Sequence, residues 1–342
     1  MTDTVLVTGG TGFVAGWCIE SLLRHGYRVR TTVRAAKGED DVRSSIARAG
    51  HGDSQSRLSF ARADLTSDEG WPEAMADCRF VLHVASPLGG GNDHGRDALV
   101  GPARDGTLRV LSAAVAAGAE RVVMTSAAAT ARPPLDVDAV SDETTWADPD
   151  DPQFDAYRRS KILAERAAWD FIERHGGATA LTTVLPGAVF GPILSASRPG
   201  SVGIIHQLLN GQPAAMPRLG LWITDVRDLA DAHVSAMERS EAAGERFLVA
   251  GEFLWMEDIA SILRTGLGSR AQKVPSETLS LEASRELARE NAQLRGLLPL
   301  LGRRNELTTE KARRLLGFSP RPASETILAC AESILALAEA SR

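Results

Sequence analysis

The feature that most constrains this chain is a glycine-rich turn in the segment Val5-Leu-Val-Thr-Gly-Gly-Thr-Gly-Phe-Val-Ala15. A β-branched run ends there and an amphipathic segment follows, which predicts a strand, a tight turn and a helix. Backbone N–H groups at such a helix N-terminus can bind a phosphate. Gly9 can adopt the turn dihedral angles, Gly12 lets the backbone approach a pyrophosphate, and Ala15 keeps the helix close to the strand. A second strand that ends about 20 residues later favours a dinucleotide site over an ordinary turn.

Strands and amphipathic segments alternate over the first half of the chain. The predicted strands are Thr4–Thr8, Arg28–Val33, Leu58–Arg62, Phe80–Val84, Arg121–Thr125 and Ala180–Leu185. The predicted helices between them are Gly12–Arg24, Asp41–Ala49, Glu73–Asp77, Asp97–Ala117 and Asp155–Arg174. This alternation predicts an α/β protein with a Rossmann fold, a doubly wound parallel sheet with helices on both faces.

The pattern changes after Leu185, where residues 186–192 are rich in turn formers. Further predicted elements are a helix at Val202–Asn210, a strand at Trp222–Thr224, a helix at Val226–Arg239, a strand at Phe247–Ala250, and helices at Thr308–Leu315 and Ala323–Ala340. We therefore expect a smaller, mainly helical C-terminal substrate domain beside the Rossmann domain. The predicted boundaries are 1–190 and 221–252 for the cofactor-binding domain, and 191–220 and 253–342 for the substrate-binding domain.

Composition narrows the class of partner. The 342 residues carry a net charge of −6, which argues against nucleic acid and anionic membrane surfaces as partners. The three cysteines, Cys18, Cys78 and Cys330, lie far apart and have no metal-ligand spacing, which indicates reduced thiols and no metal. We see no signal peptide and no apolar run that approaches the about 20 residues of a membrane span. These observations predict a cytoplasmic protein.

The end of the second predicted strand distinguishes NADP(H) from NAD. An NAD site usually places a carboxylate there for the ribose hydroxyls, whereas a 2′-phosphate needs positive charge. Here the strand ends Thr32-Val-Arg34 and Lys37 follows, with no carboxylate at the turn. We therefore predict NADP(H), the alternative being a solvated basic turn. Asp64, after the third strand, is a candidate for the adenine amino group or for a helix cap.

A tyrosine and a lysine four residues apart form the candidate catalytic pair. Tyr157 and Lys161 begin a predicted helix, so the spacing places both side chains on one face. A neighbouring ammonium lowers the pKa of a tyrosine and tunes it as a general acid. On an arbitrary helix, such a pair usually consists of solvent-exposed side chains without a function. This chain has only two tyrosines, which gives this pair more weight. Lys161 is also expected to bind the nicotinamide ribose.

The order of these motifs resembles that of the extended short-chain dehydrogenases/reductases. More narrowly, it resembles the group that contains dihydroflavonol 4-reductase, cinnamoyl-CoA reductase and microbial aldehyde and ketone reductases, within the NAD-dependent epimerase/dehydratase superfamily. The matching segments are Thr8-Gly-Gly-Thr-Gly-Phe-Val14, Thr32-Val-Arg34, Ala63-Asp-Leu65, His83-Val-Ala-Ser-Pro87, Tyr157 with Lys161, Leu185-Pro-Gly-Ala-Val-Phe-Gly-Pro192, Asp225-Val-Arg-Asp-Leu-Ala-Asp-Ala-His233 and Glu310-Lys-Ala-Arg-Arg-Leu-Leu-Gly-Phe318.

The resemblance implies a set of cofactor contacts. The pyrophosphate is expected at Gly9, Thr11, Gly12, Phe13 and Val14, the 2′-phosphate at Arg34 and Lys37, and adenine at Asp64 and Leu65. The remaining contacts are expected from Val84, Ala85, Ser86, Thr125, Lys161, Pro186 and Val189. For His83 we prefer the interpretation of a core histidine at a strand end.

The chain departs from the family at the catalytic serine. The family sequence Thr-Ser-Ser is replaced by Thr125-Ser-Ala-Ala-Ala129, so Ala127 stands where the catalytic hydroxyl belongs. Three hydroxyls are near in sequence: strand alternation puts Thr125 on the same side of the strand as position 127 and Ser126 on the other side. Ser126 can enter the site if the strand kinks at its end. Alternatively, Thr130 can reach the site from the following loop. We take Ser126 as the catalytic hydroxyl, with Tyr157 and Lys161.

These observations favour an NADPH-dependent carbonyl reductase in which Tyr157 protonates the product oxygen. Two alternatives remain open: a nucleotide-sugar epimerase/dehydratase or hydroxysteroid-type dehydrogenase, and a non-catalytic NADP-binding sensor. The expected substrate is a small carbonyl or alcohol with an apolar body, and the enzyme is expected to be a monomer or a homodimer. Candidate apolar walls of the substrate pocket are Trp146, Ile193, Ile204, Ile205, Leu208, Met216 and Trp222.

Overall fold

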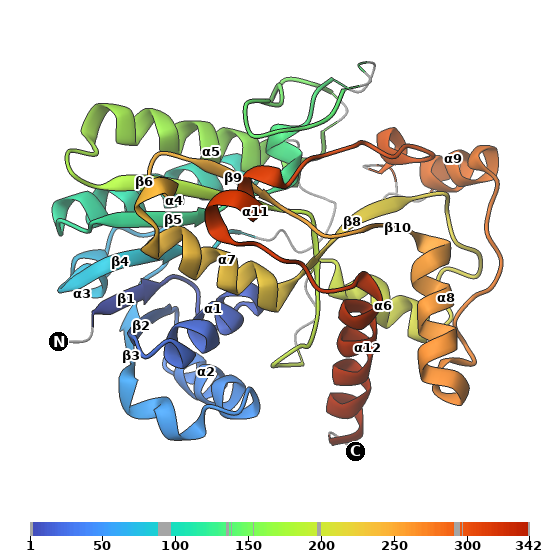
Figure 1. The fold of residues 1–342 in the computed structure, drawn as a ribbon, viewed down its shortest axis with the longest axis horizontal. Coiled ribbons are helices and arrows are strands. Elements are labelled where there is room, and N and C mark those ends of the chain that lie inside the picture. The colour runs from blue at the N-terminus through green and yellow to red at the C-terminus, as the bar shows by residue number, and fades with distance from the viewer. Residues whose placement is uncertain are drawn as a thin grey trace.

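A parallel sheet forms the centre of the N-terminal part of the computed structural model (Figure 1). The structure describes residues 3–87, 97–134, 137, 139–152, 154–196, 200–290, 295 and 297–340. The sheet has seven strands in the order β3-β2-β1-β4-β5-β6-β9. Their bounds are β1 Thr4–Val7, β2 Arg28–Val33, β3 Leu58–Arg62, β4 Cys78–His83, β5 Arg121–Thr125, β6 Ala180–Pro186 and β9 Arg246–Val249. The order reverses between β1 and β4, where a Rossmann fold binds its dinucleotide.

Helices cover both faces of this sheet because its strands are apolar on both sides. One face packs against α1 (Phe13–Arg24), α2 (Lys37–Arg48), α7 (Val226–Glu238) and α11 (Glu310–Leu316). The other packs against α3 (Trp71–Met75), α4 (Val100–Ala116) and α5 (Ala156–His175). The fold class predicted from the sequence is therefore confirmed.

The C-terminal part has a separate apolar core, at the right of Figure 1. Its helices are α6 (Val202–Leu209), α8 (Met256–Leu267), α9 (Leu281–Glu290) and α12 (Ala323–Ala340). They pack with a small sheet of order β10-β8-β7, formed by β7 (Ala188–Phe190), β8 (Gly220–Asp225) and β10 (Phe253–Trp255). Short 3₁₀ segments are η1 (Gly52–Arg57), η2 (Ala128–Ala131), η3 (Ser240–Ala242), η4 (Gly268–Ala271) and η5 (Leu298–Leu300). The domain boundaries stay a prediction, and their outermost residues, Met1 and Arg342, lie outside the described residues.

The turn-rich segment 186–192 departs from the sequence expectation because it contains β7. Gly187 N–H donates to Thr224 Oγ1 at 3.0 Å, and β7 pairs in parallel with β8. Pairing with a neighbouring strand therefore overrides the local turn preference of these residues. Among the described residues, no helix is both long and apolar enough to span a membrane. The three cysteines are buried and not linked to one another.

Candidate active site

The turn between β1 and α1 requires glycine at two consecutive positions. Gly9 has φ +73°, and a Cβ there would lie 2.9 Å from the Ala85 side chain. At Gly10 a Cβ would lie 2.4 Å from Thr31 Oγ1. The Gly9 N–H donates to Thr32 Oγ1 at 2.8 Å, which ties the turn to β2. The sequence folds this way locally because only glycine tolerates such backbone approach.

The N-terminal end of α1 fits a phosphate-bearing ligand. Its N-cap is Gly12, and no side chain caps the helix. The first amides of a helix have no intrahelical acceptor, and an anion can satisfy them. Thr11 and Gly12 are exposed, and Phe13 and Val14 are the first two helical residues. The predicted pyrophosphate contacts therefore lie together at one open helix end.

A buried hydrogen-bond chain fixes the backbone that follows β4. Thr8 Oγ1 accepts from the N–H of Val84 at 3.1 Å and of Ala85 at 3.0 Å, so its own proton points to His83 Nδ1 at 3.1 Å. His83 Nε2 then donates to Thr107 Oγ1 at 3.2 Å. Burial, and secondly the charge of Lys161, lowers the pKa of His83 to about 3. His83 is thus a neutral core histidine that positions the loop carrying Ser86.

Two exposed cations stand at the end of β2. Arg34 follows the strand and Lys37 is the first residue of α2. Asp64 accepts from the Thr66 hydroxyl at 2.7 Å and the Thr66 N–H at 2.8 Å. These bonds, with Arg34 contributing, lower the pKa of Asp64. Asp64 therefore closes its own turn, and its adenine contact, like that of Leu65, stays a prediction.

Tyr157 and Lys161 lie on one face of α5, as their spacing predicts. Asp155 caps this helix by accepting from the Arg158 N–H at 2.8 Å. The Lys161 Nζ lies 6.0 Å from the centre of the Tyr157 ring and donates to the Thr125 carbonyl at 3.2 Å. Among the described residues, none is hydrogen-bonded to the Tyr157 hydroxyl, so it is available to a ligand.

The ionisation of the pair differs from the sequence expectation. Burial raises the pKa of Tyr157, and this effect exceeds the lowering by Arg158. The expected lowering by an ammonium is therefore wrong for the protein alone, because burial dominates. Burial also lowers the pKa of Lys161 to about 8, against the opposite effect of Glu165.

The hydroxyls after β5 do not replace the missing serine. Ser126 Oγ donates to Glu165 Oε2 at 2.6 Å and is buried. Thr130 Oγ1 donates to the Ala127 carbonyl at 2.9 Å. Ala127 stays extended (φ −155°, ψ 148°), so the strand alternation continues past Thr125 and keeps Ser126 turned away. This geometry contradicts the expectation that Ser126 is the catalytic hydroxyl.

Sequence reasoning missed the cluster around Glu165. This buried carboxylate accepts from Ser126, from Thr183 Oγ1 at 2.8 Å and from Arg246 Nε at 2.9 Å. Arg246 also stacks on Trp146 at 3.6 Å, so Trp146 belongs to this cluster and not to an apolar substrate wall. The available signal was the spacing of Glu165 four residues after Lys161.

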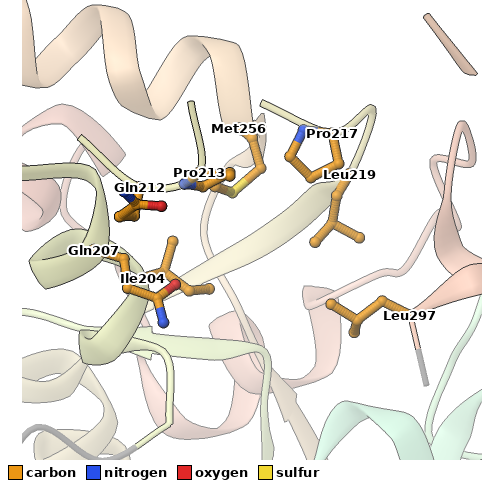
Figure 2. A pocket seen from close by; sticks show the side chains of 8 residues that line it. All are labelled: Ile204, Gln207, Gln212, Pro213, Pro217, Leu219, Met256 and Leu297. Carbon is orange, nitrogen blue, oxygen red and sulfur yellow. The ribbon is translucent and has the colours of Figure 1, made fainter. Parts of the chain in front are cut away.

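The remaining predicted wall residues separate into three groups. Ile193, Ile205, Leu208 and Met216 are buried in the C-terminal core. Ile204 lines an apolar pocket of about 70 Å³ (Figure 2), together with Gln207, Gln212, Pro213, Pro217, Leu219, Met256 and Leu297. Trp222 faces Phe253 across β8 and β10, with ring centres 5.7 Å apart.

Two of the predicted cofactor contacts, Pro186 and Val189, lie beside the carboxyl end of the sheet. Pro186 ends β6 and Val189 lies in β7.

An open glycine turn at the topological switch point and a tyrosine–lysine pair define a Rossmann-fold oxidoreductase of the short-chain type. The model of the NAD dependent epimerase/dehydratase family matches residues 5–250, and the chain belongs to that family. Within it, the chain belongs to the extended reductase group to which its motifs pointed.

Several proteins that resemble the chain in sequence or structure are reductases. The chain is 36% identical over 265 residues to cinnamoyl-CoA reductase 1 of Petunia hybrida, with 76% of each chain covered. It is 36% identical over 297 residues to a ketoreductase of Aspergillus niger, with 80% of this chain and 86% of the relative covered. The Candida albicans Gre2 complex with NADPH superposes with a TM-score of 0.80 at 27% identity, over 98% of this chain and 99% of the other. The prediction of an oxidoreductase is confirmed at the level of this group.

Proposed function

We propose that the protein is an NADPH-dependent reductase of small aldehydes or ketones. The observation that carries the proposal is the Tyr157 hydroxyl, which lies on α5 beside the buried Lys161 and has no hydrogen-bond partner among the described residues. The NADPH in Gre2 structures and the reductase activities named for the relatives support the same class. Three separate, buried thiols support the cytoplasm as its location.

The residues present fit NADPH. The uncapped end of α1 would hold the pyrophosphate, and Arg34 and Lys37 would hold the 2′-phosphate. NADPH bound there would supply the hydride that converts a carbonyl carbon into an alcohol carbon. The absence of a carboxylate at the end of β2 disfavours the epimerase alternative, in which NAD stays bound through the reaction.

The protein's part of the reaction is proton transfer. Its raised pKa keeps the Tyr157 phenol protonated at neutral pH, so Tyr157 can donate that proton to the carbonyl oxygen. The ammonium of Lys161 stabilises the phenolate that remains, until solvent returns a proton. Because Ala127 carries no hydroxyl, we assign the hydrogen bond to the reacting oxygen to Tyr157.

The test is NADPH consumption with a panel of aliphatic and aryl aldehydes and ketones. We expect turnover with NADPH. We also expect kcat/KM for NADPH to be about 10- to 100-fold above that for NADH, because Arg34 would bind the 2′-phosphate that NADH lacks. Arg34→Ser should reduce this ratio, whereas Arg28→Ser, at the other end of β2 and also exposed, should keep it. Protein that purifies with tightly bound NAD and consumes no NADPH would overturn the proposal.

A further inference from the structure

Arg132 lies at the end of α5 that carries the catalytic tyrosine, and the proposed chemistry does not use it. It follows η2, the short 3₁₀ turn between β5 and the loop that leads to α5. The charges that act on it include Arg158 and Asp155 at the start of α5. The charge of Arg158 also lowers the pKa of Tyr157, so Arg158 influences both Arg132 and Tyr157.

The Arg132 guanidinium lacks a hydrogen-bond acceptor within the described part of the chain. The adjacent Asp155 carboxylate is engaged by Arg158, at 2.5 Å, and by a backbone N–H. Burial is the main cause that lowers the pKa of Arg132 to about 10; Arg158 and Arg303 lower it further, and the carboxylates of Asp155 and Asp151 oppose this shift. A partly buried cation without an acceptor is costly unless a bound anion compensates for the lost water.

An aromatic face adjoins this cation through the segment 303–305. Arg303 acts on Arg132, and the next residue, Arg304, stacks over the rings of Trp222 at 5.8 Å and Phe253 at 5.3 Å. Trp222 Nε1 donates to the Asn305 carbonyl at 2.7 Å. Neighbouring residues of the segment 303–305 therefore interact with Arg132 and with these aromatic rings.

We propose, building on the reductase function above, that Arg132 binds a carboxylate on the substrate, and that the preferred substrates are aromatic aldehydes or ketones bearing that carboxylate. The planar guanidinium matches a carboxylate with two parallel hydrogen bonds, which an ester cannot accept with the same strength. A carbonyl substrate that has an apolar body but no carboxylate is then a weaker one.

The kinetic test compares 3- and 4-formylbenzoate with their methyl esters, using NADPH. The wild type should favour the acid over its ester by about 10- to 100-fold in kcat/KM, and Arg132→Ala should bring this ratio close to one. Arg132→Lys should retain part of the preference for the acid. Arg314→Ala is the control: it removes an exposed arginine on α11 and should retain the full preference. An acid-to-ester ratio that Arg132→Ala leaves unchanged overturns the inference while the reductase function stands.

A binding test separates the two proposals. Benzoate carries no reducible carbonyl, and we expect it to raise the Tm of the wild type but not of Arg132→Ala. Equal shifts in both proteins, or no shift in the wild type, overturn the carboxylate site even if aldehydes are reduced. A larger Arg132-dependent shift with phenyl phosphate than with benzoate also overturns the carboxylate class. If no carbonyl compound consumes NADPH, the reductase proposal fails, and the benzoate shift still decides the role of Arg132.

Discussion

The two ends of the polar face of α5 differ in how their side chains are satisfied. At Glu165 the carboxylate accepts three side-chain hydrogen bonds, from Ser126, Thr183 and Arg246. Two turns earlier, within the described residues, the hydroxyl of Tyr157 has no hydrogen bond, and neither has the guanidinium of Arg132. Glu165 is fully buried, whereas Tyr157 and Arg132 are only partly buried.

The presence or absence of hydrogen-bond partners distinguishes polar groups that stabilise the fold from polar groups proposed to act on ligands. A buried polar group without a partner costs free energy, whereas a fully satisfied network adds rigidity. The Glu165 cluster joins α5 to β5, β6 and β9 and fixes the helix on the sheet. We propose that the groups without partners at the start of the helix bind cofactor and substrate. Lys161 lies between the two ends: Glu165 raises its pKa, and its Nζ lies 6.0 Å from the centre of the Tyr157 ring.

The largest expected effect on stability comes from removing the satisfied carboxylate. Glu165→Ala leaves Arg246 buried without its ion pair, and we expect a loss of about 3–5 kcal/mol in the free energy of unfolding. Urea denaturation measures this loss. Glu173→Ala, exposed on the same helix, is the matched control and should change stability by less than about 0.5 kcal/mol. Equal losses in the two variants would contradict the division of α5 into a structural and a chemical end.

A smaller effect is expected in the pH dependence of carbonyl reduction. Lys161 is charged below its pKa of about 8 and stabilises the phenolate of Tyr157 only in that form. Reduction should therefore fall as pH rises through about 8, by at most about tenfold per pH unit. The Glu165 charge raises the pKa of Lys161, so Glu165→Gln should shift this fall to lower pH. A profile that is flat from pH 6 to 9 in both proteins would exclude this role of Lys161.

Much of the fold follows from local patterns that the sequence displays. Strands such as Arg28–Val33, Leu58–Arg62 and Arg121–Thr125 begin and end at the predicted residues, because each pairs in a parallel sheet that alternates with helices along the chain. Strand β7 was not predicted, since its pairing with β8 depends on residues about 35 positions away in the chain.

The site was predictable only where its geometry is local. The tyrosine–lysine pair lies one helical turn apart, and the glycine turn lies within a few residues, so spacing alone locates both. Ser126 was misassigned because its partner, Glu165, comes from another element. Arg132 gave no signal, because its lack of an acceptor becomes visible only when the folded neighbours are in place.

The role of Tyr157 as the proton donor is tested by NADPH oxidation by Tyr157→Phe with the best carbonyl substrate, alongside its urea denaturation curve. We expect kcat to fall by about 10²–10⁴-fold, the usual contribution of a general acid, while the free energy of unfolding stays within about 0.5 kcal/mol of the wild type. A variant that turns over as fast as the wild type would show that the lone phenol of α5 is not the proton donor.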